Sequence, residues 1–191
     1  MATDYTSPTF ILASSSPRRA ALLRLLVPAF SVIPPDVPED AVRGPADLLV
    51  LAERKAAAVA ERHPEAWVVA ADTGVFREGR AFGKPRDLGE AREFLRALSG
   101  GWHTVATGLV VRRAGQSFRE LVETRVLFRP LADWEIEWYL GREEVLDKAG
   151  AYAIQGPAAA FVERIEGDFY NVVGLPLCAL WRLLLAAGWR P

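Results

Sequence analysis

Residues 67–74, WVVAADTG, decide the fold that this sequence predicts. A run of apolar residues gives way abruptly to Asp72, Thr73 and Gly74. A continuous apolar run without alternation is typical of a β-strand that is buried on both faces. We therefore expect a central strand that ends at Ala71. Asp72 would then stand just beyond the carboxyl end of that strand, where open α/β sheets bind their ligands.

The segments before this strand alternate between short strands and helices. In chain order we expect a strand at 9–13, a helix at 17–26, a strand at 30–33, a proline-rich loop at 34–45 and a helix at 45–62. The first of these helices is well marked, because Ser16 suits the N-cap and Pro17 suits the first helical position.

The segments after it include a long hairpin. In chain order we expect a hairpin of 75–76 with 81–82, a helix at 87–98, strands at 103–112 and 117–128, a helix at 131–140, an irregular segment at 147–157, a strand at 158–165 and a helix at 172–187. This mixture of strands and helices predicts a single α/β domain over residues 1–191, with a mixed sheet flanked by helices.

The composition narrows the class of protein. Of the 191 residues, 51% are hydrophobic and 25% are charged, which is enough to build a core. The formal net charge is −1, whereas a general nucleic-acid binder carries a basic excess, so we expect no nucleic-acid partner. The sequence has neither a run of 18 apolar residues nor a basic, apolar start. We therefore expect a cytoplasmic protein with no membrane partner.

Three residue types bear on metal binding and assembly. The single cysteine, Cys178, lies in an apolar stretch, and we expect it to be a small core residue. The two histidines, His63 and His103, are isolated, which argues against a zinc-type site. Six tryptophans can serve either in the core or as interface anchors, so a homodimer stays open.

Residues 14–19, SSSPRR, place a small polar turn and two arginines at the start of the first predicted helix. A helix N-terminus favours anions, and the guanidinium fork matches phosphate oxygens. Cations there oppose the helix dipole, so Arg18 and Arg19 are locally unfavourable unless an anion neutralises them. The alternative is a capped helix with solvated arginines.

Asp72 and two lysines are further candidates. Asp72 can hold a metal or accept a proton from water, although it can also be a plain turn residue. Lys55 lies among alanines, and Lys84 stands between glycine and proline. Each lysine can reach a phosphate as a point charge, or remain solvated with its stem on apolar surface.

Residues 147–156, DKAGAYAIQG, are small enough to let the backbone approach a ligand closely. Gln155 can both donate to and accept from a base edge, although an ordered surface loop is the alternative. Asp36 and Glu39 in the proline-rich loop are either metal ligands or solvated acids. The sequence carries no P-loop, Rossmann fingerprint or G-x-S-x-G motif, which argues against kinase-like and dehydrogenase-like proteins.

Seven short motifs are spread along nearly the whole chain. They are ILASSSPRR (11–19), ERKAAAVA (53–60), AADT (70–73), GKP (83–85), LSGGWHTVATG (98–108), LDKAGAYAIQG (146–156) and NVVGLPL (171–177). In this order they resemble the Maf family of nucleoside triphosphate pyrophosphatases.

The resemblance implies metal-dependent hydrolysis of a nucleoside triphosphate between its α and β phosphates. It also implies an elongated α/β fold similar to that of inosine triphosphate pyrophosphatases. It matches Asp72 to the proposed general base, Arg18, Thr73 and Gln155 to specificity positions, Ser14, Arg19, Lys55 and Lys84 to phosphate contacts, and Glu39, with Asp72, to ligands of a divalent metal. That metal is expected to be Mg²⁺, with Mn²⁺ as the alternative.

Within the family, SPRR, ADT and IQG resemble the branch that acts on dTTP and UTP, and modified uridine triphosphates are further candidate substrates. Two alternatives stay open: a non-catalytic, nucleotide-binding regulator of cell division, and a purine-directed inosine triphosphate pyrophosphatase. The enzyme hypothesis requires Asp72 and the two arginines, Arg18 and Arg19, to face one common cleft.

Overall fold

A seven-stranded mixed β-sheet forms the centre of the computed structural model, which describes residues 9–38 and 41–191. The strand order is β2-β1-β3-β5-β6-β7, and β4 pairs with β3. β1 is parallel to β2 and β3, and the other pairs are antiparallel. The strands are β1 (Phe10–Leu12), β2 (Ser31–Val32), β3 (Trp67–Arg77), β4 (Arg80–Phe82), β5 (Trp102–Arg113), β6 (Gln116–Phe128) and β7 (Val162–Glu166).

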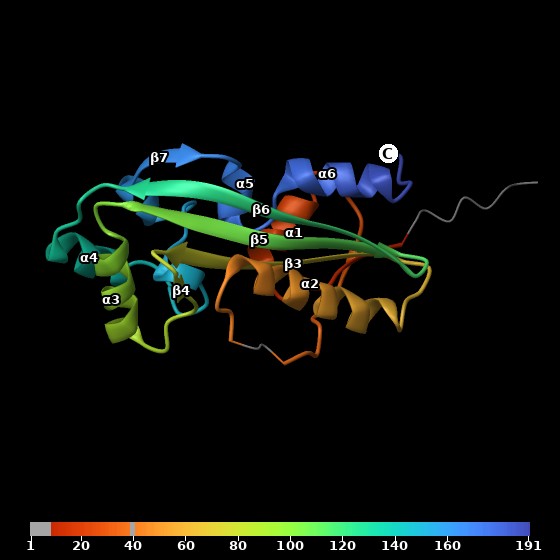
Figure 1. The fold of residues 1–191 in the computed structure, drawn as a ribbon, viewed down its shortest axis with the longest axis horizontal. Helices are drawn as coiled ribbons and strands as arrows, with labels where there is room; N and C mark the ends of the chain where they lie inside the picture. The colour runs from red at the N-terminus through yellow and green to blue at the C-terminus, as the bar shows by residue number, and fades with distance from the viewer. Residues whose placement is uncertain (1–8, 39–40) are drawn as a thin grey trace, which may run out of the picture.

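Helices cover both faces of this sheet, and β3, β5 and β6 run along the long axis of the molecule (Figure 1). α2 (Pro45–Ala60) packs on one face, whereas α1 (Pro17–Leu23) and α6 (Leu177–Ala186) pack on the other. α3 (Leu88–Leu98) and α4 (Asp133–Leu140) lie together at one end. The predicted mixed sheet flanked by helices is confirmed. Within the described ranges, every helix falls short of the length and hydrophobicity that a membrane span requires.

The side chains of β3 alternate between the two helical layers. Val68 and Ala70 belong to the core cluster that includes α2, whereas Val69 belongs to the cluster that includes α1 and α6. Because successive residues of a strand point to opposite faces, Asp72 points toward the α2 layer and Thr73 toward the opposite layer.

The prediction that the central strand ends at Ala71 is wrong. β5 still pairs with Asp72, and β3 runs on to Arg77. The edge of β3 opposite β5 is paired in two separate stretches. β1 pairs with it only as far as Val69, and β4 begins to pair at Val75, so neither strand pairs with residues 70–74. The change from apolar to polar residues therefore marks an uncovered stretch of edge within a longer strand.

The two predicted hairpins are confirmed. β3 and β4 are joined by Glu78 and Gly79, whose φ angles are 51° and 76°. β5 and β6 are joined by Ala114 and Gly115, whose φ angles are 46° and 78°. Two consecutive residues with positive φ are the backbone that a two-residue hairpin turn requires.

The strand predicted at 158–165 is only half correct. Its first half is a 3₁₀ helix, η2 (Pro157–Phe161), and the strand β7 starts at Val162. Proline at the first helical position and three alanines favour a helical turn over an extended chain.

The closing helix predicted at 172–187 is only partly correct, because two helices stand there: α5 (Phe169–Val173) and α6. They are separated at Gly174, whose φ of 122° no helix can contain, and Pro176 then lacks the N–H that a continuing helix needs. Cys178, predicted to be a core residue, is exposed on α6, where its Sγ lies 3.2 Å from Arg182.

Candidate active site

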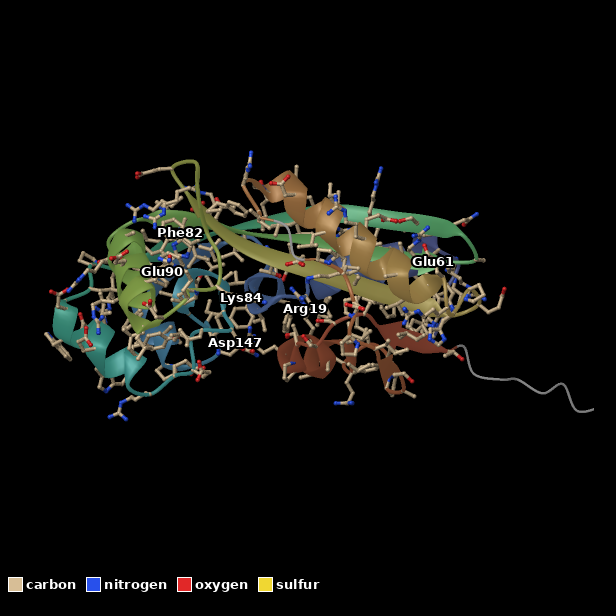
Figure 2. The ribbon with its side chains drawn as sticks, turned by 90° about the horizontal axis from the view of Figure 1, so that it is seen from below. Arg19, Glu61, Phe82, Lys84, Glu90 and Asp147 are labelled. Atoms are coloured by element: carbon tan, nitrogen blue, oxygen red, sulfur yellow. The ribbon has the colours of Figure 1, made fainter. Side chains whose placement is uncertain are left out.

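A cavity of about 730 Å³ lies beside the uncovered stretch of β3. Its walls come from the start of α1, the proline-rich loop, α2, the middle of β3, β4 and the segment after it, residues 147–155 and the end of α5. The predicted site residues that line it are Ser14, Arg18, Arg19, Lys55, Asp72, Thr73, Lys84 and Gln155. Figure 2 shows Arg19, Lys84 and Asp147 near the middle of the molecule, between the two ends of the sheet.

The structure thus brings Asp72 and both arginines, Arg18 and Arg19, to one cavity, as the enzyme hypothesis requires. The uncovered strand edge explains how this happens, because neither β1 nor β4 separates the two faces of β3 at that point. Asp36 is exposed and is not part of the cavity wall. Glu39 lies outside the described residues. The roles of all these residues stay predictions.

The turn before α1 is built by serine hydroxyls. The Ser16 hydroxyl is the N-cap of α1 and accepts a hydrogen bond from the backbone N–H of Arg19 at 3.4 Å. The Ser14 hydroxyl, which is buried, accepts from the Ser16 N–H at 3.2 Å and from the Arg19 side chain at 3.4 Å. Ser14 therefore holds the turn and the guanidinium together.

Arg19 connects three parts of the chain that lie far apart in the sequence. Its Nε donates to the carbonyl oxygen of Gly174 at 2.8 Å, and its Nη2 donates to the Thr73 hydroxyl at 2.9 Å. Gly174 was not among the site residues predicted from the sequence. The signal for it was present, because a glycine followed by Leu175 and Pro176 interrupts an otherwise apolar helical pattern.

Asp72 forms an ion pair and hydrogen bond with Lys55 of α2. The side chains of Asp72 and Lys55 are only 15% and 10% exposed, so the pair is largely shielded from water. Such shielding strengthens the electrostatic attraction and fixes the carboxylate against the wall of the cavity. The contact also explains a lysine among the alanines of α2, which periodicity alone left ambiguous.

Residues 147–156 approach β3 closely because glycines leave room. The backbone N–H of Gly150 donates to the carbonyl oxygen of Gly83 at 3.1 Å. Gly150 has a φ of 70°, and a Cβ atom there would lie 2.9 Å from Val75. This contact sets the segment that carries Gln155 beside the segment that carries Lys84, and both of these side chains are exposed at the cavity.

A second ion-pair group borders the cavity. The Arg18 guanidinium lies 3.7 Å from Asp147, which also accepts a hydrogen bond of 2.7 Å from Lys148. Partial burial raises the pKa of Asp147, but the hydrogen bond from Lys148 and the positive charges of Lys148 and Arg18 outweigh it, so the pKa is lowered overall. Lys148 is buried and was not identified from the sequence.

A buried histidine, His103, contacts a residue of the cavity wall, Tyr152. Nε2 of His103 lies 2.8 Å from the hydroxyl of Tyr152, which lines the cavity. Burial, reinforced by the charge of Arg77, lowers the pKa of His103 to about 4. His103 is therefore neutral near neutral pH and acts as a packing and hydrogen-bonding group.

Metal binding would have to use few protein ligands. Among residues 9–38 and 41–191, no cluster of three histidine, cysteine or acidic side chains could hold a metal ion. Two carboxylates of the described residues line the cavity, Asp72 beside Lys55 and Asp147 beside Arg18 and Lys148, and the resemblance implies Asp72 as the metal ligand. One carboxylate fits the way Mg²⁺ binds with phosphates, where one or two carboxylates act together with phosphate oxygens and water.

Comparison with known proteins gives consistent matches. The sequence model of one family, described as Maf-like protein, matches residues 9–187. A relative from Thermus thermophilus, named dTTP/UTP pyrophosphatase, is 47% identical over 96% of this chain and 97% of its own. Relatives with the same name from Latilactobacillus sakei and Anaeromyxobacter dehalogenans are 47% and 49% identical, over 92% and 95% of this chain and 98% and 95% of theirs.

A solved structure of the Staphylococcus aureus Ham1 protein is also similar, with a TM-score of 0.47 and 15% identity. The similarity covers 65% of this chain and 72% of that one.

Proposed function

The chain belongs to the Maf-like protein family, and on that premise we propose that it hydrolyses dTTP and UTP to the monophosphate and pyrophosphate. Full-length relatives of 47% to 49% identity carry the name of that activity. The observation that carries the proposal is the shielded pair of Asp72 and Lys55, which shares one cavity with Arg18, Arg19 and Lys84.

The charges of the cavity suit a triphosphate. Five cationic side chains of the described residues line it, and they come from α1, α2, the segment after β4 and the segment 147–156: Arg18, Arg19, Lys55, Lys84 and Lys148. Phosphoryl transfer needs little covalent chemistry from the protein, so positioning and neutralisation of phosphate charge supply most of the rate. A cavity of about 730 Å³ is also within the usual size range of small-molecule sites.

In the reaction we propose, a water oxygen attacks the α-phosphorus in line with the bond to the bridging oxygen. The new P–O bond forms as the bond to pyrophosphate breaks, and the bridging oxygen leaves with the pyrophosphate. Asp72 orients the water and takes its proton. Lys55 fixes the Asp72 carboxylate for that task, and Ser14 and Arg19 contact the phosphates.

A divalent cation, Mg²⁺ or Mn²⁺, would be held by Asp72 and Glu39 together with phosphate oxygens, and it would neutralise phosphate charge. Arg18, Thr73 and Gln155 would select the base, and modified uridine triphosphates are included among the substrates.

Two exposed tryptophans on α4, Trp134 and Trp138, support a homodimer of single-domain chains, which light scattering would test.

A panel of nucleoside triphosphates tests the proposal. Purified protein is incubated with Mg²⁺ and each of dTTP, UTP, dCTP, ITP and GTP, and both products are identified. We expect monophosphate and pyrophosphate from dTTP and UTP. Tight binding without product would favour the non-catalytic regulator of cell division instead, and preferential cleavage of ITP would favour the purine-directed enzyme.

A further inference from the structure

A buried threonine on β5, Thr107, contacts the side chain of Thr73, which lines the cavity. Thr107 is the direct partner of Thr73 in the register of β3 and β5, and it is fully buried. The two hydroxyl oxygens are 2.9 Å apart. Thr107 does not line the cavity, and the resemblance to the family assigned it no role.

Three polar protein groups lie within hydrogen-bond distance of the Thr73 hydroxyl. A hydroxyl donates one hydrogen bond and accepts two at most. Arg19 donates to the Thr73 oxygen at 2.9 Å, so Thr73 must direct its own proton elsewhere. Two protein oxygens are within reach of that proton: the Thr107 hydroxyl at 2.9 Å and the carbonyl oxygen of Gly174 at 3.5 Å. Whichever hydroxyl donates, the Thr73 oxygen is held between Arg19 and Thr107.

The far end of this chain of contacts is fixed to the sheet. The Thr107 hydroxyl reaches the carbonyl oxygen of Asn171 at 3.5 Å. The Asn171 side chain is buried and donates to Val105 at 3.0 Å and to Thr124 at 3.1 Å. Thr107 therefore links a cavity side chain to buried polar groups of α5, β5 and β6.

We propose that Thr107 is a positioning residue of the nucleotide site: together with Thr73 it holds the Arg19 guanidinium in place for the phosphates. Thr73 then contributes to phosphate binding by orienting Arg19, a role separate from the base selection proposed for it. This inference rests on the proposed function. Asp72 points to the opposite face of β3, so loss of the Thr107 hydroxyl weakens ligand binding and leaves the chemical step nearly unchanged.

The test uses Thr107→Val, which removes the hydroxyl and keeps the shape, and Thr107→Ser, which keeps the hydroxyl. The matched control is Thr104→Val, three residues away on β5 and outside the cavity wall. Binding is measured by calorimetry with two ligands, a non-hydrolysable dTTP analogue and inorganic tripolyphosphate, which has no base. Steady-state kinetics with dTTP supply KM and kcat.

We expect Thr107→Val to weaken the binding of both ligands by the same factor, about tenfold, because one buried hydrogen bond is lost. KM should rise in parallel while kcat stays within about threefold. The dissociation constants and KM of Thr107→Ser and Thr104→Val should remain within about twofold of the wild-type values.

Three results would overturn the inference. In Thr107→Val, the first is weaker binding of the dTTP analogue alone, which indicates a direct contact between Thr73 and the base, and the second is unchanged binding of both ligands. The third is a binding defect in Thr107→Ser as large as that in Thr107→Val. If Thr107→Val does not fold, Thr73→Val and Thr73→Ser allow the same comparison. Wild-type protein that binds both ligands but releases no pyrophosphate would contradict the proposed function alone, and the binding data would still decide the role of Thr107.

Discussion

At the scale of single residues, the site depends on polar groups that are held by other protein groups before any ligand arrives. Asp72 is held by Lys55, and Arg19 is held by Gly174 and Thr73. Fixed groups of this kind lower the cost of organising the site at the moment of reaction. Residue roles can therefore be separated by changing one functional group at a time.

Replacing Asp72 with asparagine should lower kcat for dTTP by about 10² or more, because the amide cannot accept the proton from water. The shape of the side chain is preserved, so binding of a non-hydrolysable analogue should remain measurable. Asp36→Asn is the matched control, since Asp36 is exposed and outside the cavity wall. Near-wild-type kcat in the Asp72 variant would exclude it as the general base.

Acid should destabilise the protein through His103. The folded pKa of His103 is about 4, below its ordinary value of 6.5, so the unfolded chain binds the proton first as the pH falls. The stability that the neutral form contributes is complete above about pH 6.5 and is lost between pH 6.5 and 4. The difference between the His103 pKa in the unfolded and folded states corresponds to roughly 3 kcal/mol of the free energy of unfolding.

Urea unfolding at pH 7.5 and pH 4.5 measures this effect, with His103→Gln as the comparison. The wild type should lose more free energy of unfolding than the variant over this range. Equal losses in the two proteins would show that His103 does not contribute to the pH dependence.

At the scale of elements, the cavity exists because β1 and β4 leave the middle of β3 uncovered. β1 is short and stops pairing at Val69, and the β3–β4 hairpin starts at Val75. The segment 147–156 then closes the cavity from one side, where Gly150 packs against Val75 and bonds to Gly83. Backbone freedom at one glycine therefore sets the position of a whole segment.

Gly150→Ala should destabilise the protein by about 1–3 kcal/mol and weaken nucleotide binding, because the new Cβ atom would meet Val75 in a left-handed backbone conformation. The control is Gly115→Ala, which has a similar φ of 78° but no atom within 4 Å of the new Cβ. Thermal unfolding and calorimetry measure both effects. Equal destabilisation with unaffected binding in both variants would contradict this role of Gly150.

At the scale of the whole molecule, the cavity is assembled from segments spread from the first strand to the end of α5. Arg19 and Gly174 alone join positions 155 residues apart in the sequence. A ligand that touches these segments together binds only the folded state and must stabilise it by mass action.

A non-hydrolysable dTTP analogue at about 100 times its dissociation constant should therefore add about 2.7 kcal/mol to the free energy of unfolding. Calorimetric unfolding with and without the analogue measures the shift in Tm. An adenosine analogue at the same concentration is the control, and a shift of equal size with it would contradict selection for the pyrimidine base.

Part of this molecule followed from the sequence alone. The mixed α/β class, both hairpins and eight of the residues that line the cavity were predicted, because side-chain periodicity, turn residues and motif chemistry are local properties of the chain. Gly174 and Lys148, which also line the cavity, were not. Local patterns failed where helix and strand preferences were balanced, as at 158–161, and where one glycine broke an apolar helix at Gly174.

The tertiary structure alone decided how the chemistry is organised. The apolar run before Asp72 does not reveal that β3 continues, because continuation depends on β5, a partner strand far away in the sequence. The pairing of Lys55 with Asp72 and the contact of Thr73 with Thr107 also join separate elements. Such contacts depend on which strands lie side by side and which face each side chain takes, and long-range packing sets both.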